Sequence, residues 1–415
     1  MKKWRKNRLK LKDIKKSKPT VFKKIFILNL FNIFSQKILF GKPLKSDLIV
    51  VDETNLDYLK RLLPGYSITV LKKVPGEYFI NWKIFKLFFR FFIKKILKPN
   101  KDNYSFSRSI NNIYYKSLIL SQEPKGVITI IDNHPIFNYL SKTIKSIPFI
   151  AIQNGLRHPF EGISGTFHVQ HYFSFGENEK KYFPKLNMEV ENYYPAGSFI
   201  NSIFSIKNTE NEKFDILIVS CWRGNIGYGK DVKDSMNSMK IFDDLMSKYI
   251  STRNLKAAVI LRNEREGQHS YMPEIGMTEE QYFNKIYPKN VKIVETDFKK
   301  RNIYDLIKKS DLIISSFGTT TLLEAYGTGK KILYAIFCED KKYYEIFDPS
   351  ILCVNPESKY FDNKLDEIIS IDKGEYHREH KKNMRFYMNQ PKPNTMNYIK
   401  SKINEIISSE NTFDK

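Results

Sequence analysis

The sequence predicts an α/β protein with two doubly wound, Rossmann-like domains that face each other across a cleft. Its 415 residues exceed one ordinary domain, and a hydrophobic fraction of 41% is enough for two cores. Short apolar runs of strand length alternate with helical segments, which favours parallel sheets. Loops rich in glycine, hydroxyl or arginine residues follow several of those runs, at the strand ends where such folds bind ligands.

The N-terminal 45 residues do not follow this alternation. Residues 1–20 form a polycationic arm, and residues 21–40 are apolar with scattered lysines, which favours a helix lying on a surface. No small-residue cleavage site follows, so we expect no secretory signal. We also expect no membrane-spanning helix, because the chain contains no run of about 18 uncharged apolar residues.

The first Rossmann-like domain is predicted over residues 46–205. Apolar runs recur there at regular intervals, and helices are expected over residues 55–63 and up to Lys142. The expected strands cover residues 48–52, 67–71, 126–132, 148–153 and 171–176.

Residues 82–98 give the strongest amphipathic pattern, with a basic residue at every third or fourth position and Phe, Ile and Leu elsewhere. Such a helix is either half-buried with a solvated lysine face or lies on an anionic inner leaflet. The basic N-terminal arm favours the second interpretation, so residues 1–40 and 82–98 are the candidate membrane contacts. The basic positions are Lys83, Lys86, Arg90, Lys94 and Lys98.

A polar, charged linker over residues 203–213 leads to the second Rossmann-like domain, which we place at residues 212–385. Strands alternate with helices again, so this sheet is also expected to be parallel. Its strands are expected at residues 214–220, 256–261, 291–294 and 311–315, with a helix around residues 234–250.

The segment from Asp311 to Leu333 carries the most informative pattern in the chain. It predicts a strand, a turn of small hydroxyl residues around a glycine, a helix and a second strand. Such a turn presents backbone N–H groups and the positive end of the helix dipole to a phosphate. An ordinary turn with a Ser/Thr cap would contain the same residues. The candidate donor-binding residues are Ser315, Ser316, Gly318, Thr319 and Thr320.

Glu324 lies four residues after Thr320, on the same side of the predicted helix. A carboxylate repels phosphate but accepts hydrogen bonds well from the hydroxyls of a ribose. The combination therefore favours a nucleotide-sugar site over a simple phosphate site.

Asp132 follows a predicted strand and precedes His134 and Pro135. A carboxylate at the end of a strand is well placed to act as a general base or as a nucleophile, and His134 is a second catalytic candidate. The same residues also fit a helix cap before a proline.

The loop after the next strand contains Asn154, Gly155 and Arg157. Amides and a bidentate arginine suit the hydroxyls or the carboxylate of a sugar, so these three are candidate substrate-binding residues. A simple loop with a turn glycine is the alternative.

Arg223 and Arg262 each follow a predicted strand of the second domain. A guanidinium at either place could neutralise a leaving phosphate as a glycosyl bond breaks. Arg265 is close by, but Glu264 and Glu266 could hold these arginines in surface ion pairs instead.

The composition narrows the class of function. The formal net charge of +24 favours anionic partners, but the chain has no zinc-finger spacing, RNA-recognition motif or basic zipper, so we expect no nucleic-acid partner. Three unpaired cysteines fit a reducing cytoplasm. No strand is followed by Asp-x-Asp and the seven histidines have no ligand spacing, so we expect neither a metal nor a cofactor.

The order of these motifs resembles the GT-B glycosyltransferases of bacterial capsule and lipopolysaccharide synthesis, near the Kdo-transferase-like groups. The resemblance covers roughly residues 47–405. It depends on the motifs at residues 131–134, 152–157, 173–177, 194–197 and 219–223, and most strongly on residues 315–324.

The resemblance implies a metal-independent, peripheral enzyme at the inner face of the cytoplasmic membrane. Such an enzyme moves a sugar from a nucleotide donor, CMP-Kdo or another CMP- or UDP-sugar, to a lipid-linked glycan. In related families a Glu at the position of Glu324 commonly binds ribose, and a C-terminal helix, here within residues 386–415, crosses back to the first domain. This sequence departs from the family at one place. Several relatives carry His-Pro after the strand that here ends in Leu261-Arg262-Asn263, so the role of that histidine is unfilled here or is taken by Arg262.

Three other functions remain open at this stage. A nucleotide-sugar 2-epimerase shares the fold but does not need a basic helix facing a membrane. A CDP-alditol glycerophosphotransferase shares both the fold and the membrane surface. A non-catalytic glycan- or membrane-binding protein would tolerate the loss of Asp132 and Glu324.

Overall fold

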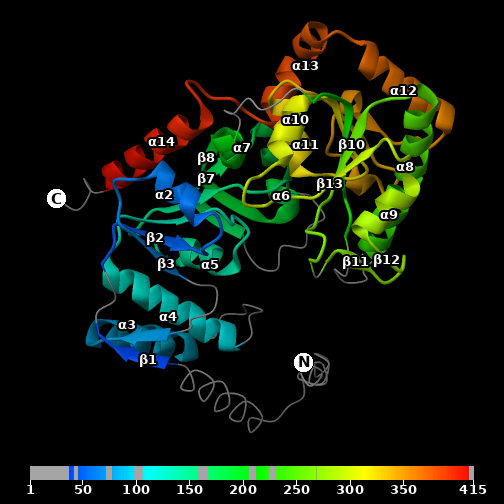
Figure 1. Cartoon of the computed structure of the whole chain (residues 1–415). Helices are drawn as coiled ribbons and strands as arrows, with labels where there is room; N and C mark the ends of the chain where they lie inside the picture. The colour runs from blue at the N-terminus through cyan, green and yellow to red at the C-terminus, as the bar shows by residue number, and fades with distance from the viewer. Residues whose placement is uncertain are drawn as a thin grey trace.

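The structure is a computed structural model that describes residues 37–41, 45–71, 77–97, 106–157, 167–204, 212–223, 230–267 and 269–410. These residues form two α/β domains, each built around a six-stranded parallel sheet (Figure 1). The doubly wound, two-domain architecture predicted from the sequence is therefore confirmed.

The first sheet has the order β3-β2-β5-β6-β7-β8, and all neighbouring strands are parallel. Its central strands are runs of apolar residues buried on both faces, as a parallel sheet requires. The strands are β2 (Leu48–Val51), β3 (Ile68–Leu71), β5 (Gly126–Thr129), β6 (Phe149–Ile152), β7 (Phe167–Ser174) and β8 (Met188–Pro195). The helices are α2 (Leu56–Leu62), α5 (Pro135–Thr143), α6 (Phe183–Leu186) and α7 (Phe199–Phe204).

The second sheet has the order β13-β10-β9-β14-β15-β16 and is also parallel throughout. Its strands are β9 (Phe214–Val219), β10 (Ala257–Ile260), β13 (Lys292–Val294), β14 (Ser310–Ser315), β15 (Lys331–Ala335) and β16 (Leu352–Cys353). The helices are α8 (Lys230–Arg253), α9 (Glu279–Ile286), α10 (Ile303–Lys309) and α11 (Thr320–Gly327), and a small hairpin joins β11 (Tyr271–Met272) to β12 (Met277–Thr278).

One of two buried apolar clusters extends across both domains. Alternate residues of β9 face opposite sides of the sheet, as expected for a strand. Leu217 lies in the same buried cluster as Leu48 of the first sheet, whereas Ile216 and Ile218 belong to a separate cluster under α8. Apolar burial therefore helps to hold the domains together.

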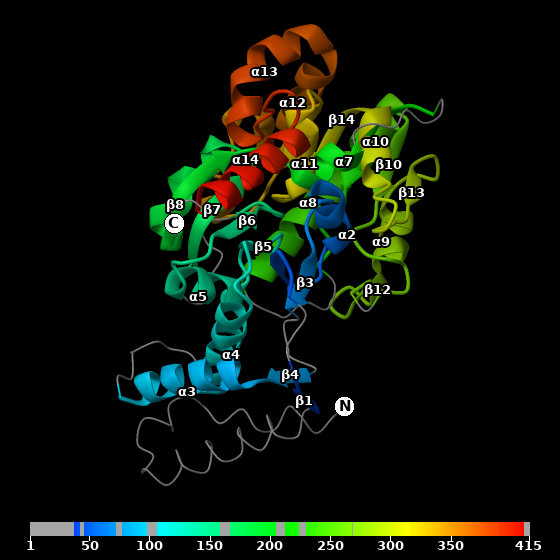
Figure 2. The same cartoon turned by 90° about the vertical axis from the view of Figure 1, so that its left-hand side faces the viewer.

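A small layer extends the first domain at the end of the molecule remote from α13 (Figures 1 and 2). It contains the parallel pair β1 (Lys37–Phe40) and β4 (Glu77–Ile80) and the helices α3 (Trp82–Leu97) and α4 (Phe106–Gln122). None of the helices in the described part of the chain combines the length and the apolarity that crossing a membrane requires.

The C-terminal helices are α12 (Ser358–Ser370), α13 (Lys373–Tyr387) and α14 (Thr395–Glu410). After α13 the chain returns to the first domain through residues 388–394, the return segment, and α14 then packs on α7. The backbone N–H of Asn389 donates to the carbonyl of Phe175 at 2.7 Å, and Tyr66 donates to Asn404 of α14 at 3.0 Å.

Some expectations need correction. Residues 37–40 form a strand and not the end of a surface helix, and the edge strand β8 is an addition. β8 has few buried side chains and lacks the apolar run by which the other strands are recognised. Residues 1–36 and most of the expected linker, residues 205–211, lie outside the described residues.

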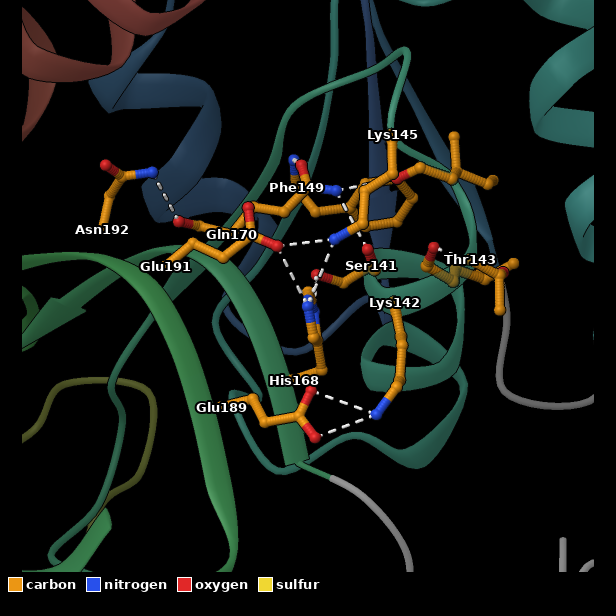
Figure 3. Close-up of polar contacts among 12 residues, drawn as sticks. Ser141, Lys142, Thr143, Lys145, Phe149, His168, Gln170, Glu189, Glu191 and Asn192 are labelled. Atoms are coloured by element: carbon orange, nitrogen blue, oxygen red, sulfur yellow. Dashed lines mark hydrogen bonds and ion pairs between the residues drawn. The ribbon is translucent and has the colours of Figure 1, made fainter. Parts of the chain in front are cut away.

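A polar cluster joins α5 to β7 and β8 (Figure 3). The Nδ1 atom of His168 lies 3.0 Å from Ser141 Oγ, and its Nε2 atom lies 3.1 Å from Glu191 Oε1. The order Ser-His-Glu is that of a hydrolase triad. However, Ser141 is fully buried inside α5, and none of the three lines the interdomain cavity described below. The cluster therefore acts as a structural connection between helix and sheet.

Candidate active site

A cavity of about 340 Å³ lies where the two domains meet. Its walls are the loops after β9, β10, β13 and β14 of the second sheet and the loop after β6 of the first. The four second-domain strands are neighbours and parallel, so their loops emerge at one edge of the sheet. This is where ligands bind in open α/β folds.

The turn after β14 forms one wall. Gly318, Thr319, Thr320 and Thr321 line the cavity, and Thr319 caps α11 by accepting a hydrogen bond from the backbone N–H of Thr321 at 3.4 Å. Helix α11 thus begins at the cavity, with the positive end of its dipole toward it.

Ser315 and Ser316 are buried below this turn and do not line the cavity. The Oγ atom of Ser315 donates to the carbonyl of Val219 at 2.9 Å and lies 2.9 Å from Cys221 Sγ. Ser238 Oγ donates to the carbonyl of Ser316 at 3.2 Å. Both serines therefore lie where they hold the end of β14 in place.

Three arginines line the cavity: Arg223 after β9, Arg262 after β10 and Arg301 after β13. The Arg223 guanidinium lies over the ring of Phe317, 5.1 Å from its centroid. Asp297 is the one carboxylate among the lining residues, so positive charge exceeds negative charge around the cavity.

Arg301 was not singled out from the sequence. Its backbone is left-handed, with φ of 53°, and its Nη2 atom donates to Asn55 Oδ1 of the first domain at 3.2 Å. Its Nε atom is buried and has no hydrogen-bond partner among the described residues. A basic loop after a strand was the available signal, but only the strand order shows that this loop reaches the cavity.

Glu279 fixes the loops that carry Arg223 and Arg262. Its carboxylate accepts from Ser220 Oγ at 2.5 Å, from the backbone N–H of Arg262 at 2.7 Å and from that of Asn263 at 3.1 Å. Burial raises the pKa of Glu279, and these donors oppose the shift. No local pattern singles out Glu279, because nothing in the sequence indicates that a residue at the start of α9 contacts two earlier loops.

The loop after β6 brings the first domain to the site. Gly155 and Leu156 line the cavity, and the backbone N–H of Leu156 donates to Thr320 Oγ1 at 2.8 Å across the domain junction. The side chains of Asn154 and Arg157 contact each other at 3.1 Å and are not among the lining residues.

Asp132 lies behind this loop and is fully buried. Its carboxylate accepts two hydrogen bonds from Arg157, one of them from Nε at 2.9 Å, and one from Tyr172 Oη at 2.9 Å. His134 is the N-cap of α5 and accepts from the backbone N–H of Phe137 at 3.5 Å. Neither residue lines the cavity. Asp132 supports the loop through Arg157, His134 caps α5, and a catalytic role for either stays a prediction.

Glu324 joins the two domains and is not among the cavity-lining residues. It accepts from Ser198 Oγ of the first domain at 2.5 Å and from Tyr304 Oη at 3.1 Å. Burial raises the pKa of Glu324 to about 7, and the two hydroxyl donors oppose the shift. The ribose contact expected for Glu324 would require these hydrogen bonds to be exchanged for substrate hydroxyls.

The raised pKa of Glu324 predicts a pH-dependent stability. The folded protein holds this proton more tightly than the unfolded chain, so the contribution is complete below the usual pKa of 4.5 and is lost as pH rises through about 7. We therefore compare thermal unfolding midpoints at about pH 5.5 and about pH 8.5, on either side of the raised pKa. The midpoint of Glu324→Gln should fall less over this range than that of the wild type. Asp243, whose pKa burial also raises to about 7, is present in both proteins and cancels in the comparison. If the unfolding midpoints of the two proteins change equally with pH, the raised pKa of Glu324 is contradicted.

Two other expectations concern charge and metals. Arg265 forms surface ion pairs with Glu280 at 3.1 Å and Glu295 at 3.7 Å, and it does not line the cavity. Across the described ranges, no group of three or more His, Cys, Asp or Glu residues is arranged to hold a metal ion.

Comparison with solved structures shows the GT-B fold. A protein assigned as a UDP-N-acetylglucosamine 2-epimerase from Listeria monocytogenes matches with a TM-score of 0.51 and 11% identity, over 86% of this chain and 96% of that chain. A glycosyltransferase from Rickettsia africae matches with a TM-score of 0.49 and 12% identity, over 90% of this chain and 98% of that chain. The wall teichoic acid polymerase TagF matches with a TM-score of 0.48 and 13% identity, over 88% of this chain and 89% of that chain.

No protein-family model matches the chain, and no curated protein matches it in sequence. At the identities found among solved structures, the likeness shows the fold alone. The chemistry has to be argued from the residues at the cavity.

Proposed function

We propose that this protein is a glycosyltransferase that moves a sugar from a nucleotide-activated donor to a lipid-linked surface glycan at the inner face of the cytoplasmic membrane. The observation that carries the proposal is the interdomain cavity, where three arginines surround the start of helix α11. Guanidinium groups and a helix N-terminus both bind phosphate oxygens, and together they suit the phosphate of a CMP- or UDP-sugar such as CMP-Kdo.

In the reaction, the bond from the anomeric carbon to the phosphate oxygen breaks, and the acceptor hydroxyl oxygen bonds to that carbon. The leaving phosphate gains negative charge, which Arg223, Arg262 and Arg301 are placed to neutralise together with the backbone of the 318–321 turn. Because the site has this many positive groups of its own, the proposed reaction does not require a metal ion.

The acceptor proton must go to a base. Asp132 is the sequence-based candidate, and in this role its carboxylate would have to leave its contacts with Arg157 and Tyr172. Asp297 lines the cavity and is the second carboxylate to test. Hydrogen bonds from the backbone N–H of Lys300 and, to a smaller extent, from that of Lys299 hold the pKa of the Asp297 carboxyl below its usual value.

Nucleotide binding is expected to raise the thermal unfolding midpoint of the protein. Ligand at about 100 times its Kd adds about 2.7 kcal/mol to the stability of a folded state that binds it. The panel is CMP, CDP, UDP, UMP, GDP and ADP, each without and with a divalent cation. Stabilisation by CMP would direct the substrate search to CMP-sugars and CDP-alditols, and stabilisation by UDP alone would direct it to a UDP-sugar transferase or an epimerase.

Single Gln substitutions at Arg223, Arg262 and Arg301 should each weaken binding of the effective nucleotide by about tenfold or more, because each removes a charge-assisted contact. The matched control is Arg265→Gln, which removes an arginine that lies outside the cavity. No stabilisation by any nucleotide, or an equal loss in the control, would contradict the proposed donor site.

A further inference from the structure

Helix α3 presents three kinds of surface along its length. One side packs on α4: Ile84 is buried, and Lys116 of α4 lies over the ring of Phe91 at 4.7 Å. Lys83 adds an ion pair at 2.6 Å with Glu123, the residue that follows α4. These contacts fix the rotation of the helix about its axis and so decide which residues face outward.

The outward side is an apolar stripe at steps of three or four residues. Its rings are in contact, with centroids 5.9 Å apart for Trp82 and Phe85 and 6.1 Å apart for Phe85 and Phe89. Phe40 of β1, which is 86% exposed, lies on the same small layer. The exposed fractions along the stripe are 77% for Trp82, 48% for Phe85, 51% for Phe89, 40% for Ile93 and 74% for Leu97.

A basic row lies beside this apolar stripe. Lys86, Arg90 and Lys94 each follow a stripe residue by one position and are exposed. The helix has no acidic residue between Trp82 and Leu97. Large exposed apolar patches on soluble proteins usually mark an interaction site, and a basic border without acidic residues selects an anionic partner.

We propose that the apolar stripe of α3 docks on an anionic lipid bilayer, with its rings in the interfacial region and the basic row at the level of the lipid phosphates. Ring side chains such as Trp82 are suited to this region, and the basic residues gain from the negative surface potential. Figures 1 and 2 show α3 and β1 at the end of the molecule remote from α13. A role in delivering the enzyme to a lipid-linked acceptor rests on the proposed function, but bilayer binding itself does not.

The test uses the full chain with vesicles of phosphatidylcholine alone or of equal parts phosphatidylcholine and phosphatidylglycerol. We expect co-sedimentation with the anionic vesicles, weakening as salt is added. The triple variant Trp82→Ser, Phe85→Ser, Phe89→Ser should bind them about tenfold more weakly or worse. The matched control replaces exposed apolar residues elsewhere, Ile241→Ser, Tyr271→Ser and Tyr360→Ser, and should bind as the wild type does.

Trp82 also supplies a direct signal. In a Trp4→Phe background, Trp82 and the fully buried Trp222 remain, so a blue shift of emission on adding anionic vesicles reports insertion of Trp82. The proposal is overturned if the wild type does not bind anionic vesicles or if the triple variant binds them as well as the wild type does. It is also overturned if the apolar stripe mediates self-association of the protein in the absence of lipid. Nucleotide-dependent stabilisation should be unchanged in the triple variant, so failure of docking and failure of the donor site can be told apart.

Discussion

Replacing Asp132 by asparagine is expected to destabilise the first domain by about 3–5 kcal/mol. The side chains of Asp132 and Arg157 are 0% and 6% exposed, so the substitution leaves a buried guanidinium without its counter-charge. The loss should appear in equilibrium urea unfolding. A loss below about 1 kcal/mol, the usual net value of one hydrogen bond, would show that the pair does not hold the loop.

The double variant Asp132→Asn, Arg157→Gln is the control, because it removes both charges and leaves a neutral amide at each position. It should be more stable than Asp132→Asn alone, since a neutral pair carries no buried charge. For catalysis the double variant is compared with Arg157→Gln. If both bind nucleotide but only the double variant loses transfer activity, the catalytic prediction for Asp132 is supported; if the double variant keeps its activity, Asp132 is not the catalytic base.

The second large effect is expected at Gly197. An alanine there would be destabilising by roughly 2–5 kcal/mol, combining a left-handed backbone with overpacking. Gly197 has φ of +82°, and a Cβ atom would collide with the carbonyl oxygen of Asn389 in the return segment. Because backbone rather than a flexible side chain is in the way, the return segment should separate from the first domain. Hydrogen exchange of residues 386–410 should increase accordingly.

Gly276→Ala is the matched control for this prediction. Gly276 also has a positive φ, +69°, but a Cβ atom there meets nothing within 4 Å. Gly276→Ala should lower the free energy of unfolding by only about 1–2 kcal/mol, the cost of a left-handed backbone at a non-glycine residue. Hydrogen exchange of residues 386–410 should not change. Equal effects at both glycines would rule out the collision as the cause.

Elements recognised from local pattern were predicted well. The apolar run before Ser315, the glycine turn and the following helical segment appear as β14, the 316–319 turn and α11. β8 was missed because an edge strand with few buried residues has no continuous apolar run. Its pairing with β7 is decided by the neighbouring strand and not by its own composition.

The residues of the candidate site show the same difference between local and long-range signals. Gly318, Thr319 and Thr320 line the cavity, as do Arg223, Arg262 and Gly155, because the loops that carry them follow strands whose ends lie at the cavity. Asp132 and Glu324 face partners that are distant in sequence. No local pattern indicates that Tyr172 and Ser198 are those partners.

The two parallel domains follow from the amino-acid sequence alone, since the alternation of apolar runs and amphipathic helices is a local property with its own period. The sequence also determined which loops follow the strands and therefore which residues could meet a ligand. Only the tertiary structure decided that Arg301 joins the cavity, that Glu279 fixes two of its loops and that Glu324 connects the domains. The strand order and the packing of the domains decide which distant side chains meet, and burial at those places raises the pKa of Glu279 and Glu324.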